Sequence, residues 1–103
     1  MKVAITSTDD NVESIIDPRF GRCTFFTIYD TESHAIEFLK NPAKESSEGA
    51  SSAAVQFIAK QKVNKVISGD FGIKIKSLFD SLHIEMQIEK HQDKTILSLL
   101  KGL

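Results

Sequence analysis

The segment at residues 17–23, Asp-Pro-Arg-Phe-Gly-Arg-Cys, brings together the residue types of this chain that are best suited to binding chemistry. Arg19 and Arg22 keep their charge at physiological pH and present forked donors that match carboxylate or phosphate groups. Cys23, the only cysteine, could ligate iron or another soft metal as a thiolate, and neighbouring arginines favour that form. The segment is therefore a candidate site for an anion or a soft metal.

The same residues also have a purely structural interpretation. Arg19 and Arg22 are equally able to pair with the nearby carboxylates of Asp9, Asp10 or Asp17. A lone cysteine beside an aromatic strand is more often a small buried hydrophobic residue than a ligand. The proline and the first glycine of the segment shape a tight corner whether or not a ligand binds there.

A second turn, Gly-Asp-Phe-Gly at residues 69–72, directly follows the predicted strand at 63–68. In open α/β sheets, ligands tend to bind beyond the carboxyl ends of parallel strands, where the strand order reverses. If the strand at 1–6 pairs with the strand at 63–68, their ends bring residues 7–10, the second turn and the first segment together. We expect a ligand crevice at this edge of the sheet.

The predicted binding residues come from both loops. Glycines in the second turn permit close backbone approach, and the helix that follows offers unpaired N–H groups to an anion. The predicted set is Arg19, Phe20, Gly21, Arg22, Cys23, Gly69 and Gly72, with Cys23 as the metal ligand.

The elements that must position these loops follow from the hydrophobic periodicity. Alternating or β-branched runs predict strands at 1–6, 24–30, 34–40, 63–68 and 84–88. Helical spacing recurs at 50–58, 75–82 and 96–103, and we expect Asp93 to cap the last helix. The order β-β-β-α-β-α-β-α, with an antiparallel hairpin first and parallel crossovers later, indicates an α/β protein with a mixed five-stranded sheet.

Length and composition limit the class of protein. A chain of 103 residues is the size of one domain, so we treat residues 1–103 as a single unit. The apolar (41%) and charged (26%) fractions are typical of a soluble globular protein, and the net charge of −1 gives no general attraction to nucleic acid or acidic membranes. No apolar stretch approaches the roughly 20 residues that span a bilayer, so we expect a cytoplasmic protein.

With these motifs placed, the sequence resembles the dinitrogenase iron-molybdenum cofactor biosynthesis family over nearly the whole chain. The motifs that carry the resemblance are residues 1–5, the segment 17–23, Asn41-Pro42, Gly49-Ala50 and residues 68–72. The resemblance implies a small three-layer ribonuclease H-like domain that binds or carries an iron-sulfur or iron-molybdenum cluster precursor without catalysing a reaction. It also implies a cofactor-assembly protein as partner, a monomer or weak homo-oligomer, and a purified protein that can be empty.

Two other functions remain open at this stage. A small-anion or protein-interaction module could keep the same fold and use no metal. A metal-dependent nuclease is a more distant alternative, in which Asp9, Asp10, Asp17 and Asp70 would converge on two metal ions. The apolar interior of the first strand and the lack of a basic face argue against the nuclease.

Overall fold

A mixed sheet and three helices form the framework of the computed structural model, which describes residues 1–46, 48–72 and 74–103. The strands are β1 (Lys2–Ser7), β2 (Phe25–Asp30), β3 (Ile36–Lys40), β4 (Lys65–Ser68) and β5 (Glu85–Ile88). The helices are α1 (Ala50–Lys60), α2 (Ile75–Ser81) and α3 (Ile96–Lys101). The predicted α/β class, with a mixed five-stranded sheet, is confirmed. No described helix has the length and apolar character needed to cross a membrane.

The strands lie in the sheet in the order β3-β2-β1-β4-β5, which differs from their order along the chain. The short connection after β2 makes β2 and β3 an antiparallel hairpin, and β2 also pairs antiparallel with β1. β1 pairs parallel with β4, which is the pairing that the predicted crevice requires, with Ala4 opposite Val66. Because β4 also pairs parallel with β5, three neighbouring strands end at the same edge of the sheet.

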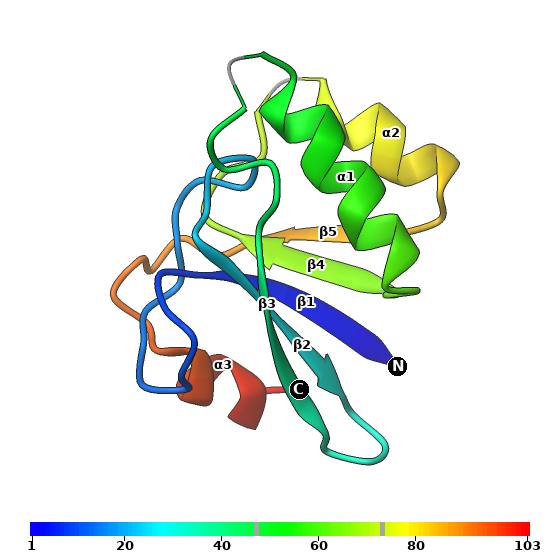
Figure 1. Ribbon diagram of the computed structural model, residues 1–103. Helices are drawn as coiled ribbons and strands as arrows, with labels where there is room; N and C mark the ends of the chain where they lie inside the picture. Colours follow the sequence, from blue (N-terminus) through cyan, green and yellow to red (C-terminus); the bar gives the residue numbers. More distant parts are fainter. Residues whose placement is uncertain (47, 73) are drawn as a thin grey trace.

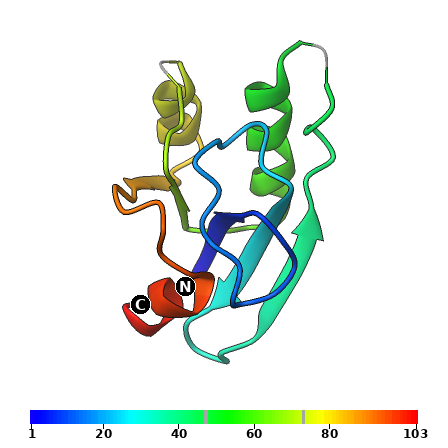
Figure 2. The ribbon, with the colours of Figure 1, turned by 90° about the vertical axis from the view of Figure 1, so that its left-hand side faces the viewer.

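The sheet is the middle of three layers, with α1 and α2 on one face and α3 on the other (Figure 1, Figure 2). Alternation along β1 directs Val3 and Ile5 toward α3 and Ala4 toward α1 and α2, so both faces of this central strand are buried. On the second face, the apolar side chains of α3 are Ile96, Leu99 and Leu100.

Four phenylalanine rings connect the segment 17–23, through Phe20, to the core that lies between the sheet and the helices α1 and α2. The Phe20 ring centroid lies 5.3 Å from that of Phe79, 5.5 Å from Phe71 and 5.8 Å from Phe26. Such separations suit tilted and edge-to-face contacts between aromatic rings. The loop that carries Phe20 is therefore held in place by core packing as well as by hydrogen bonds.

The last helix begins at Ile96, where the periodicity places its first apolar residue, but its cap differs from the predicted one. Its N-cap is Thr95, whose Oγ1 accepts a hydrogen bond from the Ser98 N–H at 3.2 Å, so the prediction that Asp93 is the cap is wrong. The Ile96 N–H donates to the Ser14 carbonyl at 2.9 Å, and this contact with a distant loop fixes where the helix can start. Local capping preference could not reveal it.

Replacement of the Phe79 ring should destabilise the protein strongly. Phe79 is fully buried and contacts two other rings, so we expect Phe79→Ala to lower the free energy of unfolding by about 3–5 kcal/mol. Urea denaturation followed by circular dichroism measures this change. Leu82→Ala, which removes a 40% exposed side chain just after the same helix, is the matched control and should cost much less; equal losses would contradict the assigned packing.

Candidate functional site

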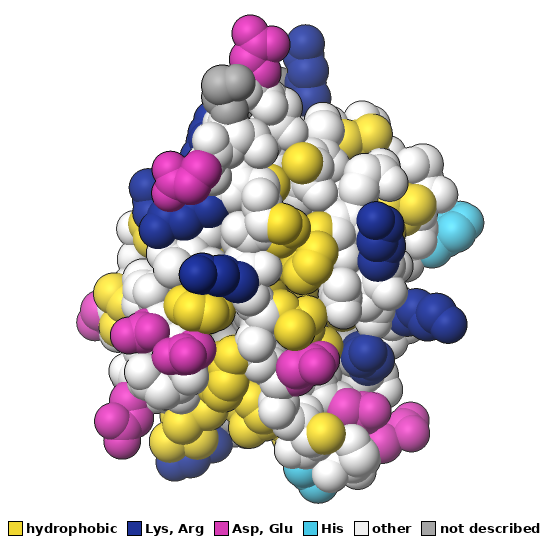
Figure 3. Space-filling view, viewed as in Figure 1, with side chains coloured by type: hydrophobic (Ala, Val, Ile, Leu, Met, Phe, Trp, Pro, Cys, Tyr) yellow, Lys and Arg dark blue, Asp and Glu magenta, His cyan; other side chains and the backbone are white. Residues whose placement is uncertain are grey.

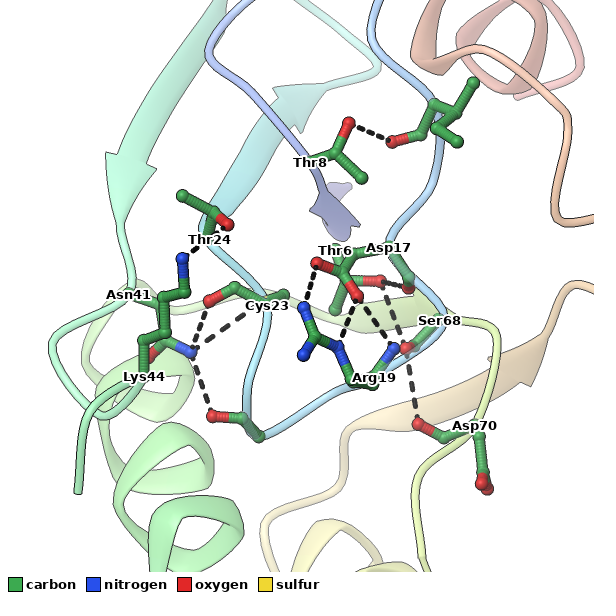
Figure 4. A network of polar contacts seen from close by, with 12 residues as sticks. Thr6, Thr8, Asp17, Arg19, Cys23, Thr24, Asn41, Lys44, Ser68 and Asp70 are labelled. Atoms are coloured by element: carbon green, nitrogen blue, oxygen red, sulfur yellow. Dashed lines mark hydrogen bonds and ion pairs between the residues drawn. The ribbon is translucent and has the colours of Figure 1, made fainter. Parts of the chain in front are cut away.

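The segment 17–23 is tied to the ends of the two central parallel strands by buried hydrogen bonds (Figure 4). The Asp17 N–H donates to the Thr6 carbonyl at 2.9 Å, and Thr6 Oγ1 donates to the Asp17 carbonyl at 2.7 Å. Thr6 Oγ1 also hydrogen bonds with Ser68 Oγ at 3.0 Å. β1 and β4 therefore fix the origin of the loop.

The same loop meets the turn at residues 69–72. The Phe20 N–H donates to the Asp70 carbonyl at 3.1 Å, and a Cβ added to Gly69 would lie only 2.7 Å from Pro18 Cα. The structure thus brings the two loops together as the sequence predicts. It does not bring in residues 7–10, none of which lines a hollow at this junction. Ser7 Oγ lies 3.1 Å from Thr27 Oγ1, and residues 8–10 are exposed, with the Thr8 N–H donating to the Ile15 carbonyl at 3.1 Å.

Two adjoining open hollows lie where these loops meet the first turn of α1 and the start of α2. The larger, of about 330 Å³, is lined by Arg22, Lys74 and the first residues of α1. The smaller, of about 180 Å³, is lined by both loops and includes Asp70. The two hollows share Arg22, Ser51, Phe71 and Gly72.

The predicted site residues divide into three groups by position. Arg22 and Gly72 line both hollows. Arg19, Phe20 and Gly21 line only the smaller one. Gly69 and Cys23 line neither, because Gly69 packs on Pro18 and Cys23 lies in the core cluster behind the loop.

Arg19 is folded back on the buried carboxylate of Asp17 (Figure 4). Its backbone N–H and Nε donate to Asp17 Oδ1 at 2.9 and 3.3 Å, and Nη2 donates to Oδ2 at 3.4 Å. Hydrogen bonding and the charge of Asp17 raise the pKa of Arg19, which stays cationic. The charge of Arg19 is therefore largely matched by Asp17, which is one of the carboxylate pairings that the sequence left open as a structural role.

Arg22 has a different environment. Its Nη1 donates to the Lys44 carbonyl at 3.0 Å and to the Ser46 carbonyl, so neutral acceptors orient the guanidinium. In the described part of the chain, neither Arg22 nor Lys74 forms an ion pair, and the residues lining the larger hollow include these two cations and no acid. The larger hollow is therefore locally positive.

The first turn of α1 adds further donors to this hollow. The first intrahelical bond runs from the Ala53 N–H to the Gly49 carbonyl at 3.0 Å, so the earlier N–H groups have no partner within the helix. Gly49 has no capping side chain, and the first turn contains no acidic residue. The unpaired groups and the helix dipole both favour an anion.

Sequence reasoning missed Ser51, Ser52 and Lys74, which line the larger hollow. The available signal was the uncapped helix start Gly-Ala-Ser-Ser at residues 49–52. That signal does not indicate which loop faces the helix, because the contact depends on the close approach of Gly21 to Ser51.

Cys23 is fully buried, and the geometry does not support the predicted role as a metal ligand. Its Sγ accepts a hydrogen bond from Asn41 Nδ2 at 3.6 Å. Burial, reinforced by the negative charge of Asp17, raises the pKa of the Cys23 thiol well above its usual range. Arg19 opposes this shift only weakly, so the thiol stays protonated at neutral pH.

The carboxylates considered for a nuclease do not converge. Asp9 and Asp10 are exposed in the first loop, Asp17 binds Arg19, and Asp70 Oδ1 accepts from the Gly72 N–H at 3.2 Å. Within residues 1–46, 48–72 and 74–103, no group of three or more His, Cys, Asp or Glu side chains is placed to hold a metal ion.

The fold and the site define a small α/β domain with an open, positively charged hollow beyond the carboxyl ends of its parallel strands. The whole chain, residues 1–103, matches the family described as Dinitrogenase iron-molybdenum cofactor, and the protein belongs to this family. The family resemblance seen in the sequence is confirmed.

Individual proteins resemble this chain in sequence or in fold. An uncharacterized protein from Methanocaldococcus jannaschii is 30% identical over 89 residues, which cover 84% of this chain and 72% of the relative. The apo form of the orange protein from Desulfovibrio gigas superimposes with a TM-score of 0.90 at 25% identity, covering 97% of this chain and 83% of that one. A proposed NifB protein from Thermotoga shares the fold, with a TM-score of 0.80 at 23% identity and coverage of 98% and 84%.

A side chain at residue 21 should disturb the junction between the loop and α1. A Cβ on Gly21 would lie 2.6 Å from Ser51 Oγ and 2.9 Å from Ser51 N, so either the loop or the helix must move. We expect Gly21→Ala to lower the free energy of unfolding by about 1–3 kcal/mol, measured by thermal or urea denaturation. Gly102→Ala is the matched control, since its nearest neighbour would be the Leu99 carbonyl oxygen at 3.6 Å. Unchanged stability of Gly21→Ala would show that the close approach is absent.

The raised pKa of Cys23 predicts a loss of stability in alkali. In the unfolded chain the thiol loses its proton above about pH 8.5, whereas in the folded protein it keeps it. The stabilisation is therefore complete below that pH, and above it the free energy of unfolding should fall by about 1.4 kcal/mol per pH unit from this group. Urea denaturation from pH 8 to 10 measures the slope, which Cys23→Ala should reduce. Parallel profiles for the two proteins would contradict burial of the thiol.

Proposed function

We propose that this protein is a non-enzymatic binding or carrier domain for an anionic iron-sulfur or iron-molybdenum cluster precursor, built on a ribonuclease H-like fold. The observation that carries the proposal is the larger hollow, where Arg22, Lys74 and the first turn of α1, whose N–H groups have no partner within the helix, line one open space. Membership of the Dinitrogenase iron-molybdenum cofactor family supports the class of cargo. The orange protein neighbour is described in an apo form, the term for a protein without its bound group.

The donor set favours a cargo that brings its own sulfide ligands. A cluster precursor whose terminal ligands are its own sulfides, as in tetrathiomolybdate, carries net negative charge without protein thiolates, and such an anion suits two cations and a helix N-terminus. A cluster ligated by the protein would need several accessible thiolates or imidazoles, and Cys23 is buried and protonated. We therefore assign cargo binding to charge and hydrogen bonding, with Arg22 as the principal contact.

The exposure of the hollow suits a carrier that must release its cargo. Lys74 and Ser52 are exposed and Arg22 is half-buried, so a bound anion stays accessible from solvent. Contacts with exposed cations are weaker than buried ones because water screens them. The expected partner is a cofactor-assembly protein in the cytoplasm that delivers or receives the cluster at this edge of the sheet.

Binding of a molybdenum-sulfide anion tests the proposal. Tetrathiomolybdate, in which molybdenum carries only sulfide ligands, should bind anaerobically with a change in its visible spectrum. We expect Arg22→Ala to raise the Kd about tenfold and Lys74→Ala to raise it several-fold, since each removes a charge-assisted contact. Lys62→Ala removes an exposed lysine that lines neither hollow and should leave the Kd unchanged. Cys23→Ser should leave the spectrum of the bound anion unaltered.

Contrary outcomes separate the alternatives. Equal affinity for inorganic phosphate and tetrathiomolybdate, with the same dependence on Arg22, would favour a small-anion module without a metal. If Cys23→Ser were the one variant of these to lose the visible spectrum of the bound anion, the thiol would be a ligand after all. The absence of binding by either anion would overturn the proposal.

A further inference from the structure

Arg22 depends on a neighbouring loop for its orientation. Both hydrogen bonds of its guanidinium in the described part of the chain use Nη1, and their acceptors are the backbone carbonyls of Lys44 and Ser46. These carbonyls lie in the loop after β3, about twenty residues away in sequence. The direction of the Arg22 side chain is therefore set by the shape of the segment 41–46.

The Asn41 side chain fixes the backbone on both sides of Arg22. Its Nδ2 donates to the Gly21 carbonyl at 3.1 Å and to the Cys23 carbonyl at 3.0 Å (Figure 4). Gly21 and Cys23 are the immediate neighbours of Arg22 in the chain. A single carboxamide thus holds the peptide groups that carry the arginine.

The other end of the same carboxamide shapes the loop that receives the guanidinium. Asn41 Oδ1 accepts from the Ala43 N–H at 2.9 Å, and the Asn41 carbonyl accepts from the Lys44 N–H at 3.4 Å. The Ser46 N–H then donates to the Ala43 carbonyl at 3.1 Å. These contacts form a turn that presents the carbonyls of residues 44 and 46 to Arg22.

We propose that Asn41 is a positioning residue for Arg22, and that through Arg22 it sets the affinity of the larger hollow for anions. Asn41 is 5% exposed and lines neither hollow, so it acts without touching the cargo. The effect on cargo binding rests on the proposed function, whereas the effect on Arg22 does not.

The role requires an amide. Asn41 uses both donor hydrogens and its acceptor, each toward a different backbone group, and only Asn has this combination at this length. Aspartate has the same shape and keeps the acceptor for Ala43, but it would place a buried carboxylate oxygen against two carbonyl oxygens. Asn41→Asp therefore releases the contacts beside Arg22 while it retains the start of the turn.

A double-variant cycle tests the coupling on the full chain. We expect Asn41→Asp to raise the Kd for tetrathiomolybdate about five- to tenfold, and to add nothing further in the Arg22→Ala background, because the two residues act as one unit. Asn64→Asp is the matched control. Asn64 is exposed, its Oδ1 accepts from the Lys2 N–H at 2.8 Å, and it lines neither hollow. Independent effects that multiply in the double variant would overturn the proposal.

Nitrogen-15 relaxation of the Arg22 Nε–Hε group provides a readout that does not depend on cargo. Its order parameter should fall in Asn41→Asp and remain at the wild-type value in Asn64→Asp. If Asn41→Asp does not fold, Asn41→Ser, which is too short to reach both carbonyls, replaces it. An unchanged order parameter refutes positioning by Asn41. If wild-type protein fails to bind the anion but the order parameter falls in Asn41→Asp, the proposed function is refuted and the positioning role of Asn41 stands.

Discussion

The buried hydroxyl of Thr6 is the constraint on which the arrangement of the site depends. It hydrogen bonds with Ser68 Oγ, which joins the carboxyl ends of β1 and β4, and it donates to the Asp17 carbonyl. The segment 17–23 therefore starts from a fixed point at the edge of the sheet. Phe20 then anchors the loop in the core, and its N–H reaches the Asp70 carbonyl. The residues that follow, Gly21 and Arg22, lie against the first turn of α1.

The electrostatic character of the site is local, in a protein whose net charge is only −1. On the face shown in Figure 3, basic and acidic side chains are interspersed around a central band of hydrophobic side chains, and neither sign dominates. The two arginines of the segment 17–23 differ because their partners differ. Asp17 matches the charge of Arg19, whereas backbone carbonyls orient Arg22, which forms no ion pair with any residue that the structure describes. Positive potential therefore concentrates at one hollow.

Much of the fold could be predicted from periodicity, because strands and helices express local patterns of burial. The hairpin was accessible in this way, whereas the meeting of the two loops depended on an assumed pairing of β1 with β4, which the structure shows. Contacts between distant segments were not accessible in this way. Thr95 replaces Asp93 as cap because a remote loop binds the helix start. Cys23 is buried, and its thiol pKa is raised because desolvation outweighs the nearby arginine. The positions of Lys74 and Ser51 beside Arg22 likewise depend on packing.

The uncapped start of α1 has a consequence for the lifetime of the protein. A glycine N-cap gives up roughly a few tenths of a kcal/mol relative to a capping side chain. On the proposed function, the bound anion takes the place of the missing capping side chain, because it accepts hydrogen bonds from the N–H groups that have no partner within the helix. Loading and folding are then thermodynamically linked. The occupied domain would be the more resistant to proteolysis, so a cell could retain loaded carriers and remove empty ones without a dedicated sensor.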